Sequence, residues 1–200
     1  MQHMLHDTND QTQGNTPACH RHASWLLLIY RLPGQPSSAR STIWRETRRL
    51  GALSLQHGVC LLPSSDENRA AYARLAQRVE EYGGEASVLA TSSPGTVWHE
   101  KTVAAFNRAR DEEYQEVIDE TERFQEEIAR ERRKGKFIFA ELEDEESNLE
   151  RLQKYLARVE ARDTFGAPGR SDAVAAVARC MIVLDAFAQE IYEHQKAPER

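Results

Sequence analysis

The stretch Trp25-Leu26-Leu27-Leu28-Ile29-Tyr30 is an unbroken apolar run in this 200-residue chain. It is far shorter than the roughly 18 residues of a membrane-spanning helix, and the turn-forming segment Leu32-Pro33-Gly34-Gln35-Pro36 follows it directly. A short apolar run with such a boundary is typical of a strand whose two faces are both covered. We therefore expect a central strand of a sheet here, and no membrane partner.

The residues after this strand predict a helix and then a hairpin. The helix is expected from Ser37 or Ser38 to Leu50, and Gly51 ends it. Its buried face is expected to hold Ile43, Trp44, Thr47 and Leu50. Short strand patterns at 52–56 and 59–62 flank His57-Gly58, which indicates a tight hairpin or a bulge.

A second helix and a last strand complete the first half of the chain. Ser64 and Glu67 form a capping-box pattern, which predicts a helix from there to Tyr82. Gly83-Gly84 ends that helix, and residues 85–91 read as a strand. The order strand-helix-strand-strand-helix-strand is that of ferredoxin-like domains, so we expect residues 24–92 to form a ferredoxin-like α/β domain.

Residues 93–200 are expected to be mainly helical. Apolar residues there recur at alternating spacings of three and four, and breaks at Gly135 and at residues 165–169 divide them into three helices. This pattern predicts an antiparallel three-helix bundle or a coiled-coil hairpin. The expected inward positions are Tyr114, Val117, Thr121, Phe124 and Ile128, then Ile138, Leu142, Glu145, Leu149, Leu152, Leu156 and Val159, and finally Val174, Val177, Met181, Leu184, Ala188 and Ile191.

Residues 1–23 are polar and lack any periodicity, which predicts a flexible tail. The tail shows no secretion signal, and three scattered cysteines favour a reducing compartment, so a cytoplasmic location is expected. Cys19, His20 and His22, with His3 and His6 nearby, offer metal-ligand chemistry, but their spacing fits no zinc motif. We therefore expect no metal and no cofactor.

The net charge of −6 is unevenly distributed. Residues 24–92 carry eight Arg against six Asp and Glu, whereas residues 93–200 carry 17 Lys and Arg against 24 Asp and Glu. An anionic partner such as nucleic acid is therefore expected on the first part of the chain.

Five arginines of this first part are the candidate site. Arg45, Arg48 and Arg49 have the i, i+3, i+4 spacing of one helix face, opposite Ile43 and Trp44, while Arg40 lies near the helix start and Arg31 ends the first strand. A guanidinium presents a planar fork of donors that suits phosphate and small oxyanions. The alternative is that these arginines are solvated and pair with Glu46 and with acids of the helical part.

Catalytic patterns are weak in this sequence. Cys60 follows His57 by three residues, and residues three apart on a strand face opposite sides. The clustered acids of the helical part lack the Glu-x-x-His pairs of carboxylate-bridged metal centres. Glu145 is the one acid on an expected seam, where it would set register or form a salt bridge. We expect no enzyme.

Several short motifs resemble the N-terminal region of the ChrB family, the regulators of bacterial chromate-resistance operons. They are Trp25-Leu26-Leu27, Ser38-Ala39-Arg40, Trp44-Arg45, Leu50-Gly51-Ala52, Gly58-Val59, Leu61-Leu62-Pro63, Gly83-Gly84, Gly135-Lys136-Phe137, Phe139-Ala140-Glu141-Leu142-Glu143 and Arg162-Asp163-Thr164-Phe165-Gly166-Ala167-Pro168. The resemblance covers about residues 24 to 195 and implies a chromate-responsive transcriptional regulator that binds DNA. The family's further C-terminal domain is not expected in this chain.

Three functions from different classes are therefore open. The first is a DNA-binding regulator that responds to an oxyanion, with self-association through the helices. The second is a structural or adaptor protein whose helices dock a partner, and the third is a small oxidoreductase or hydrolase that uses Cys60. The α/β half is also similar in layout to CRISPR-associated nucleases and phenylacetate-type repressors, but Arg31 follows the first strand where those nucleases hold a metal with an aspartate, and this disfavours a metal-dependent nuclease.

Overall fold

The computed structural model of the chain describes residues 24–34 and 37–196. The tail predicted at residues 1–23, with its Cys19 and histidines, lies outside these described residues. None of the helices within them is long and apolar enough to cross a membrane.

Four strands form one antiparallel sheet. They are β1 (Ser24–Arg31), β2 (Leu53–Gln56), β3 (Val59–Pro63) and β4 (Glu85–Ser92). Their spatial order is β2-β3-β1-β4, and each neighbouring pair is antiparallel. The apolar run of β1 is therefore an inner strand, as its composition predicts.

The hairpin between β2 and β3 contains both features that the sequence indicates. His57-Gly58 forms the turn, and the register shifts between Ser54 and Gln56. Gly58 has a φ of 74°, and a side chain there would clash with the Tyr30 carbonyl oxygen. The Tyr30 amide in turn donates to the Gly58 carbonyl at 2.8 Å. Glycine is therefore required by both conformation and space.

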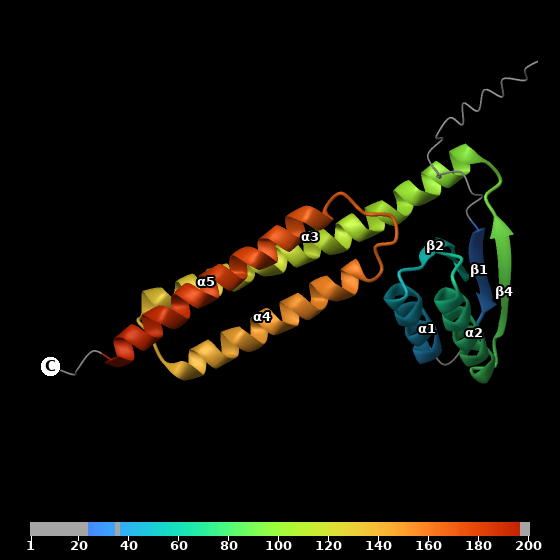
Figure 1. Ribbon diagram of the computed structural model, residues 1–200. Helices are drawn as coiled ribbons and strands as arrows, with labels where there is room; N and C mark the ends of the chain where they lie inside the picture. The colour runs from blue at the N-terminus through green and yellow to red at the C-terminus, as the bar shows by residue number, and fades with distance from the viewer. Residues whose placement is uncertain (1–23, 35–36, 197–200) are drawn as a thin grey trace, which may run out of the picture.

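Helices α1 (Ser37–Arg49) and α2 (Asp66–Glu81) cover one face of the sheet (Figure 1). Alternate residues of β1 meet them there, among them Leu26 and Leu28, because side chains on a strand point to opposite faces in turn. The buried members of this core are Leu26, Leu28, Ile43, Cys60, Leu62, Tyr72, Leu75 and Val79. We call the sheet with α1 and α2 the sheet part.

Two local predictions for these helices are wrong. Trp44 is 54% exposed, although it was expected on the buried face of α1. Ile43 and Trp44 are adjacent in sequence and so lie about 100° apart around the helix, and only Ile43 points to the sheet. The cap of α2 is Ser65 rather than Ser64, because the Ser65 Oγ accepts a hydrogen bond from the Asn68 amide at 3.1 Å.

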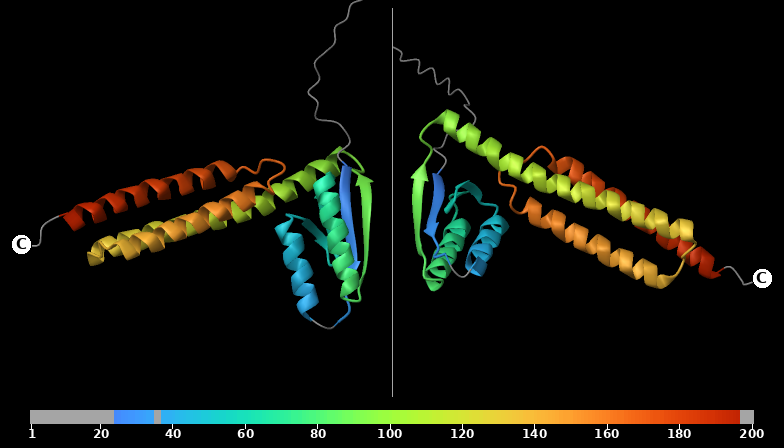
Figure 2. Two further views of the ribbon diagram at one scale, coloured as in Figure 1. Left: turned by 60° about the horizontal axis from the view of Figure 1, so that its bottom comes forward. Right: turned by 180° about the vertical axis from the view of Figure 1, so that it is seen from behind.

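Three long helices make up the rest of the described chain. They are α3 (Thr96–Lys134), α4 (Phe139–Glu160) and α5 (Arg170–Lys196), and we call them the helical part. The chain breaks at Gly135 and within 165–169, where the sequence predicts turns. The helices lie alongside one another and extend away from the sheet, and α4 runs in the opposite direction to α3 and α5 (Figures 1 and 2).

The predicted inward positions hold for α3 and in part for the other two helices. All five predicted positions of α3 are buried, and in α4 only Ile138, which precedes the helix, is exposed. In α5 the predicted positions Val174 and Met181 are exposed. The buried face is instead Ala173, Ala176, Val177, Cys180, Leu184, Phe187 and Ile191. Because α5 is apolar on more than one side, the spacing of its apolar residues does not determine which side is buried.

An aromatic cluster joins the helical part to the second face of the sheet. The rings of Trp25 from β1 and Phe106 from α3 have centroids 5.8 Å apart, and Phe106 and Phe165 lie 5.4 Å apart. Trp25 and Phe106 are buried, together with Leu61 of β3. The first turns of α3 and the turn after α4 are thereby fixed against the sheet.

Candidate functional site

The exposed face of α1 carries three of the five predicted arginines. Arg45, Arg48 and Arg49 are all exposed. Arg45 makes only local contacts, with Nε donating to the Ser41 carbonyl at 3.3 Å and Nη2 to Thr42 Oγ1 at 3.5 Å. Among the described residues, neither Arg45 nor Arg49 has an ion pair. These two guanidiniums therefore present unneutralised positive charge to solvent.

Glu46, the acid of α1, does not neutralise this face. It forms an ion pair with Arg78 of α2. The expectation that Glu46 pairs with the arginines of its own helix is therefore wrong, because the helix packing brings an arginine of α2 to it instead. The Glu46 carboxylate therefore pairs with Arg78 and forms no ion pair with Arg45 or Arg49.

Arg48 occupies a different environment from its two neighbours on α1. Its guanidinium lies 5.3 Å from the ring centroid of the exposed Trp44, a cation–π geometry. Its Nη2 is also 4.0 Å from Oε1 of Glu113 in α3. Arg48 therefore faces the helical part, whereas Trp44 shares the exposed side of α1 with the arginines rather than lying opposite them.

Arg31 and Arg40 lie at the end of β1 and the start of α1. Arg31 forms an exposed ion pair with Glu85 at 3.1 Å, which is worth little in water. Arg40 Nη2 donates to the Gly34 carbonyl at 2.7 Å and so links the start of α1 to the segment after β1. Both line a hollow of about 740 Å³ whose wall includes Tyr30, Leu32, Ser41, Trp44, Ser54 and His57. The structure thus brings these two arginines to one hollow, whose lining does not include Arg45 or Arg49.

Two arginines that are not among the predicted site residues lie beside Glu113: Arg110, which is buried, and Arg162, which is partly buried. Arg110 Nη1 is 3.1 Å and Arg162 Nη2 is 2.7 Å from Glu113 Oε2. Burial lowers the pKa of the Arg110 guanidinium. One signal could have found Arg110, since it continues the buried stripe four residues before Tyr114. Arg162 follows α4 and is brought there by tertiary packing alone.

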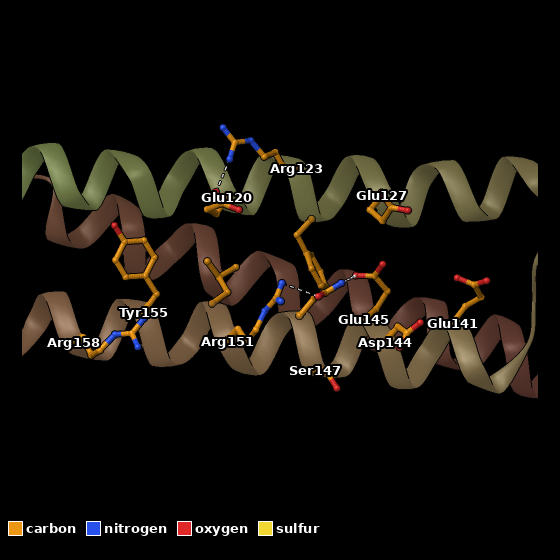
Figure 3. A pocket seen from close by; sticks show the side chains of 13 residues that line it. Glu120, Arg123, Glu127, Glu141, Asp144, Glu145, Ser147, Arg151, Tyr155 and Arg158 are labelled. Atoms are coloured by element: carbon orange, nitrogen blue, oxygen red, sulfur yellow. Dashed lines mark hydrogen bonds and ion pairs between the residues drawn. The ribbon is translucent and has the colours of Figure 1, made fainter. Parts of the chain in front are cut away.

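A second hollow, of about 810 Å³, lies between α3 and α4 (Figure 3). Glu127, Glu141, Asp144 and Glu145 lie toward one end of it and Tyr155 and Arg158 toward the other, while Glu120 lies beside its ion-pair partner Arg123. A chain of hydrogen bonds runs from Arg151 to Asn148 at 2.9 Å and from Asn148 to Glu145 at 3.1 Å. Because its charges are of both signs and partly paired, this hollow does not select for an anion. Glu145 is buried on the seam as predicted, and its polar contact is to Asn148.

Cys60 and His57, the pair considered for catalysis, lie among the described residues, whereas Cys19 and the histidines near it lie outside them. Burial raises the pKa of the Cys60 thiol, which opposes formation of the nucleophilic thiolate. His57 lies in the turn and lines the hollow at Arg31 and Arg40. In the described part of the chain, no group of three or more His, Cys, Asp or Glu residues is placed to hold a metal ion.

Sequence comparison places these features in a family. The profile described as "Protein ChrB, N-terminal" matches residues 40–198. The chain belongs to the ChrB family. Protein ChrB of Cupriavidus metallidurans (strain CH34) is 33% identical over 103 residues, which is 52% of this chain and 28% of that protein. No solved structure matches the chain.

The ChrB match begins within α1. It therefore includes Arg40, Arg45, Arg48 and Arg49, whereas Arg31 precedes it. The same match extends over α3 and α4 and includes the buried group at Glu113. The family assignment thus rests on both the sheet part and the helical part.

Proposed function

We propose that this ChrB-family chain is a transcriptional regulator of the chromate-resistance type, which binds DNA in the cytoplasm and responds to an oxyanion. The observation that carries the proposal is the exposed face of α1, where Arg45 and Arg49 have no acidic partner among the described residues. DNA affinity is dominated by neutralisation of phosphates, and guanidiniums held on one helix face can follow a phosphate backbone.

We also propose that the chain consists of a ferredoxin-like domain followed by a three-helix bundle. The strand order β2-β3-β1-β4 with antiparallel neighbours is compatible with a ferredoxin-like domain, and the long helices with a three-helix bundle of coiled-coil character. In this proposal the sheet part binds DNA and the helical part supports self-association. The protein acts by binding and performs no catalysis.

A mobility-shift titration with the DNA upstream of the chain's own gene tests this function. We expect a shift at micromolar protein that weakens as salt is raised, because phosphate contacts release counterions. Added chromate should change the midpoint of the shift. Absence of any salt-sensitive shift at micromolar protein would contradict the proposal.

An adaptor role is the second candidate, and the exposed side of α5 favours it. Ile182 is 69% exposed, and Val174 and Met181 are also exposed on this helix. Exposed apolar residues along one helix are typical of a surface that docks another protein. Copurification of a protein partner, with no nucleic acid and no mobility shift, would favour this function over the first.

A further inference from the structure

Strand β4 is an edge strand of the sheet, and its outer edge is unpaired within the described chain. It pairs with β1 along its full length, and no strand of the described residues lies on its other side. It forms the outer border of the sheet part (Figures 1 and 2). An edge of eight residues leaves a row of main-chain groups without strand partners, and such a row is a template for pairing with another chain.

The alternation of an antiparallel strand identifies the open groups of β4. The Tyr30 amide donates to the Gly58 carbonyl and the Ser64 amide donates to the Ser24 carbonyl, so the even-numbered residues of β1 direct their main-chain groups toward β3. The odd-numbered residues of β1 therefore bond to β4, and the register pairs them with the odd-numbered residues of β4. The groups left pointing outward are the amides and carbonyls of Ala86, Val88 and Ala90.

The sequence of β4 does not block this edge. The strand contains no proline, no lysine and no break in its register with β1, which are common features that prevent edge pairing. Its one charged residue, Glu85, occupies the first position and forms an ion pair with Arg31 of the same sheet. The other residues of the strand are alanine, serine, threonine, valine and leucine. β4 is therefore able to accept a further strand.

A second copy of β4 provides partners for these groups. Two copies related by a two-fold axis perpendicular to the sheet run antiparallel, so the outward amides of each face outward carbonyls of the other. With the axis at Leu89, Val88 lies opposite Ala90 of the second copy, and Ser87 lies opposite its Thr91. Leu89 is 48% exposed on the face opposite α1 and α2, and in this register it meets its own counterpart.

Helix α2 lies where it would pack against its own copy. It contacts both β1 and β4, so two copies of α2 would lie about 10 Å apart once the two β4 strands are about 5 Å apart, and helices pack at that distance. The flank of α2 that faces α1 is marked by Arg78, which pairs with Glu46. Helical spacing places Arg69, Ala73 and Glu80 on the opposite flank, toward the edge of the sheet.

Arg69 and Glu80 are complementary between two antiparallel copies of α2. They are about three turns apart, or about 16 Å along the helix, so they cannot pair within one chain. Both are exposed, and neither has an ion pair among the described residues, although Arg69 Nη2 donates to Ser64 Oγ at 3.4 Å. When the middles of the two helices meet near the small Ala73, Arg69 of each copy comes beside Glu80 of the other.

We propose that two copies of the chain pair antiparallel along β4, about a two-fold axis at Leu89, and so join their four-stranded sheets into one. The two α2 helices then pack together through Arg69 and Glu80. This interface lies on the sheet part and is separate from the self-association proposed for the helical part. It leaves the arginines of α1 outside, because α1 lies on the other flank of α2. Each dimer would carry two copies of that arginine face on the same side of the joined sheet.

Sedimentation velocity of the full chain at tens of micromolar protein tests the strand pairing. We expect Ala90→Pro to sediment with half the mass of the wild type, since proline removes an outward amide and leaves the bonds to β1 in place. Ala90→Ser keeps that amide, so this matched control should retain the wild-type mass. Circular dichroism checks that both variants are folded, and the charge variants of α2 replace Ala90→Pro if it is not.

Charge reversal on α2 tests the pairing across the axis without changing the strand. Glu80→Arg should raise the dissociation constant of the dimer about ten-fold, because the axis repeats the repulsion with Arg69 twice. Adding Arg69→Glu to this variant should restore the affinity, since the signs are exchanged and the pair is kept. A contact within one chain cannot produce this rescue, because the two residues are too far apart.

A wild-type chain that stays monomeric at tens of micromolar protein would overturn the β4 interface. Equal masses for Ala90→Pro and Ala90→Ser would also overturn it, as would a double variant of α2 that associates no better than Glu80→Arg alone. These measurements contain no DNA, so the two proposals fail separately. A mobility shift by a chain without the β4 interface would leave the DNA-binding function standing.

Discussion

Glu145 shows how one buried acid can set the pH dependence of stability. It is 4% exposed, and burial raises the pKa of its carboxyl, with Glu127 and Glu131 adding to the effect. A folded-state pKa above the unfolded one means that the stabilising contribution belongs to the protonated form and is lost as pH rises through the folded pKa. The ionised carboxylate of Glu145 therefore lowers the free energy of unfolding at neutral pH.

Glu145→Gln should accordingly raise the melting temperature at pH 7 by a few degrees, because glutamine keeps an acceptor for Asn148 and carries no charge. The gain should shrink as pH falls and vanish below the ordinary carboxyl pKa of 4.5, where both states of the wild type are protonated. Thermal denaturation followed by circular dichroism between about pH 4 and pH 8 measures it. A gain that does not change with pH would contradict this account.

The N-terminus of α2 depends on one hydroxyl. Ser65→Ala should lower the free energy of unfolding by about 1 kcal/mol, since it removes the acceptor for the Asn68 amide. Ser64→Ala is the matched control and should change stability by less than about 0.5 kcal/mol. Chemical denaturation of both variants measures the difference, and equal losses would show that Ser65 is not the cap.

The elements were predictable where spacing and local signals agree. The apolar run of β1, the hairpin at His57-Gly58 and the break at Gly135 each carry a strong local signal, and all are observed. The errors arose where the local signal was ambiguous. Ile43 and Trp44 are adjacent apolar residues of which only Ile43 is buried, and an apolar α5 has more than one possible buried side.

The candidate site was predictable only in part, because some of its contacts join segments that are distant in sequence. Composition and spacing identified the arginines of α1, because they are close in sequence. The approach of Arg162 to Glu113, and the pairing of Glu46 with Arg78, join elements distant in sequence. No spacing rule describes such contacts, since they follow from the packing of α2 against α1 within the sheet part and of the turn after α4 against α3 within the helical part.

At the scale of the whole molecule, the aromatic cluster of Trp25, Phe106 and Phe165 couples the two parts. Phe106→Ala should cost about 3–5 kcal/mol, because it leaves a cavity at this contact. We expect one calorimetric unfolding transition for the wild type and two for the variant, as the helical part and the sheet part lose their connection. A single transition at an unchanged temperature would contradict this coupling.

The dependence of DNA affinity on salt tests most directly that the exposed arginines of α1 bind phosphate. Fluorescence anisotropy of a labelled upstream duplex, titrated over a range of chloride concentrations, gives the slope of log affinity against log salt. For Arg45→Gln with Arg49→Gln we predict that this slope becomes shallower by about two, with weaker binding at every concentration. Arg179→Gln, at an exposed position of α5, is the control and should leave both quantities unchanged; an equally unchanged slope and affinity for the α1 variant would contradict the account.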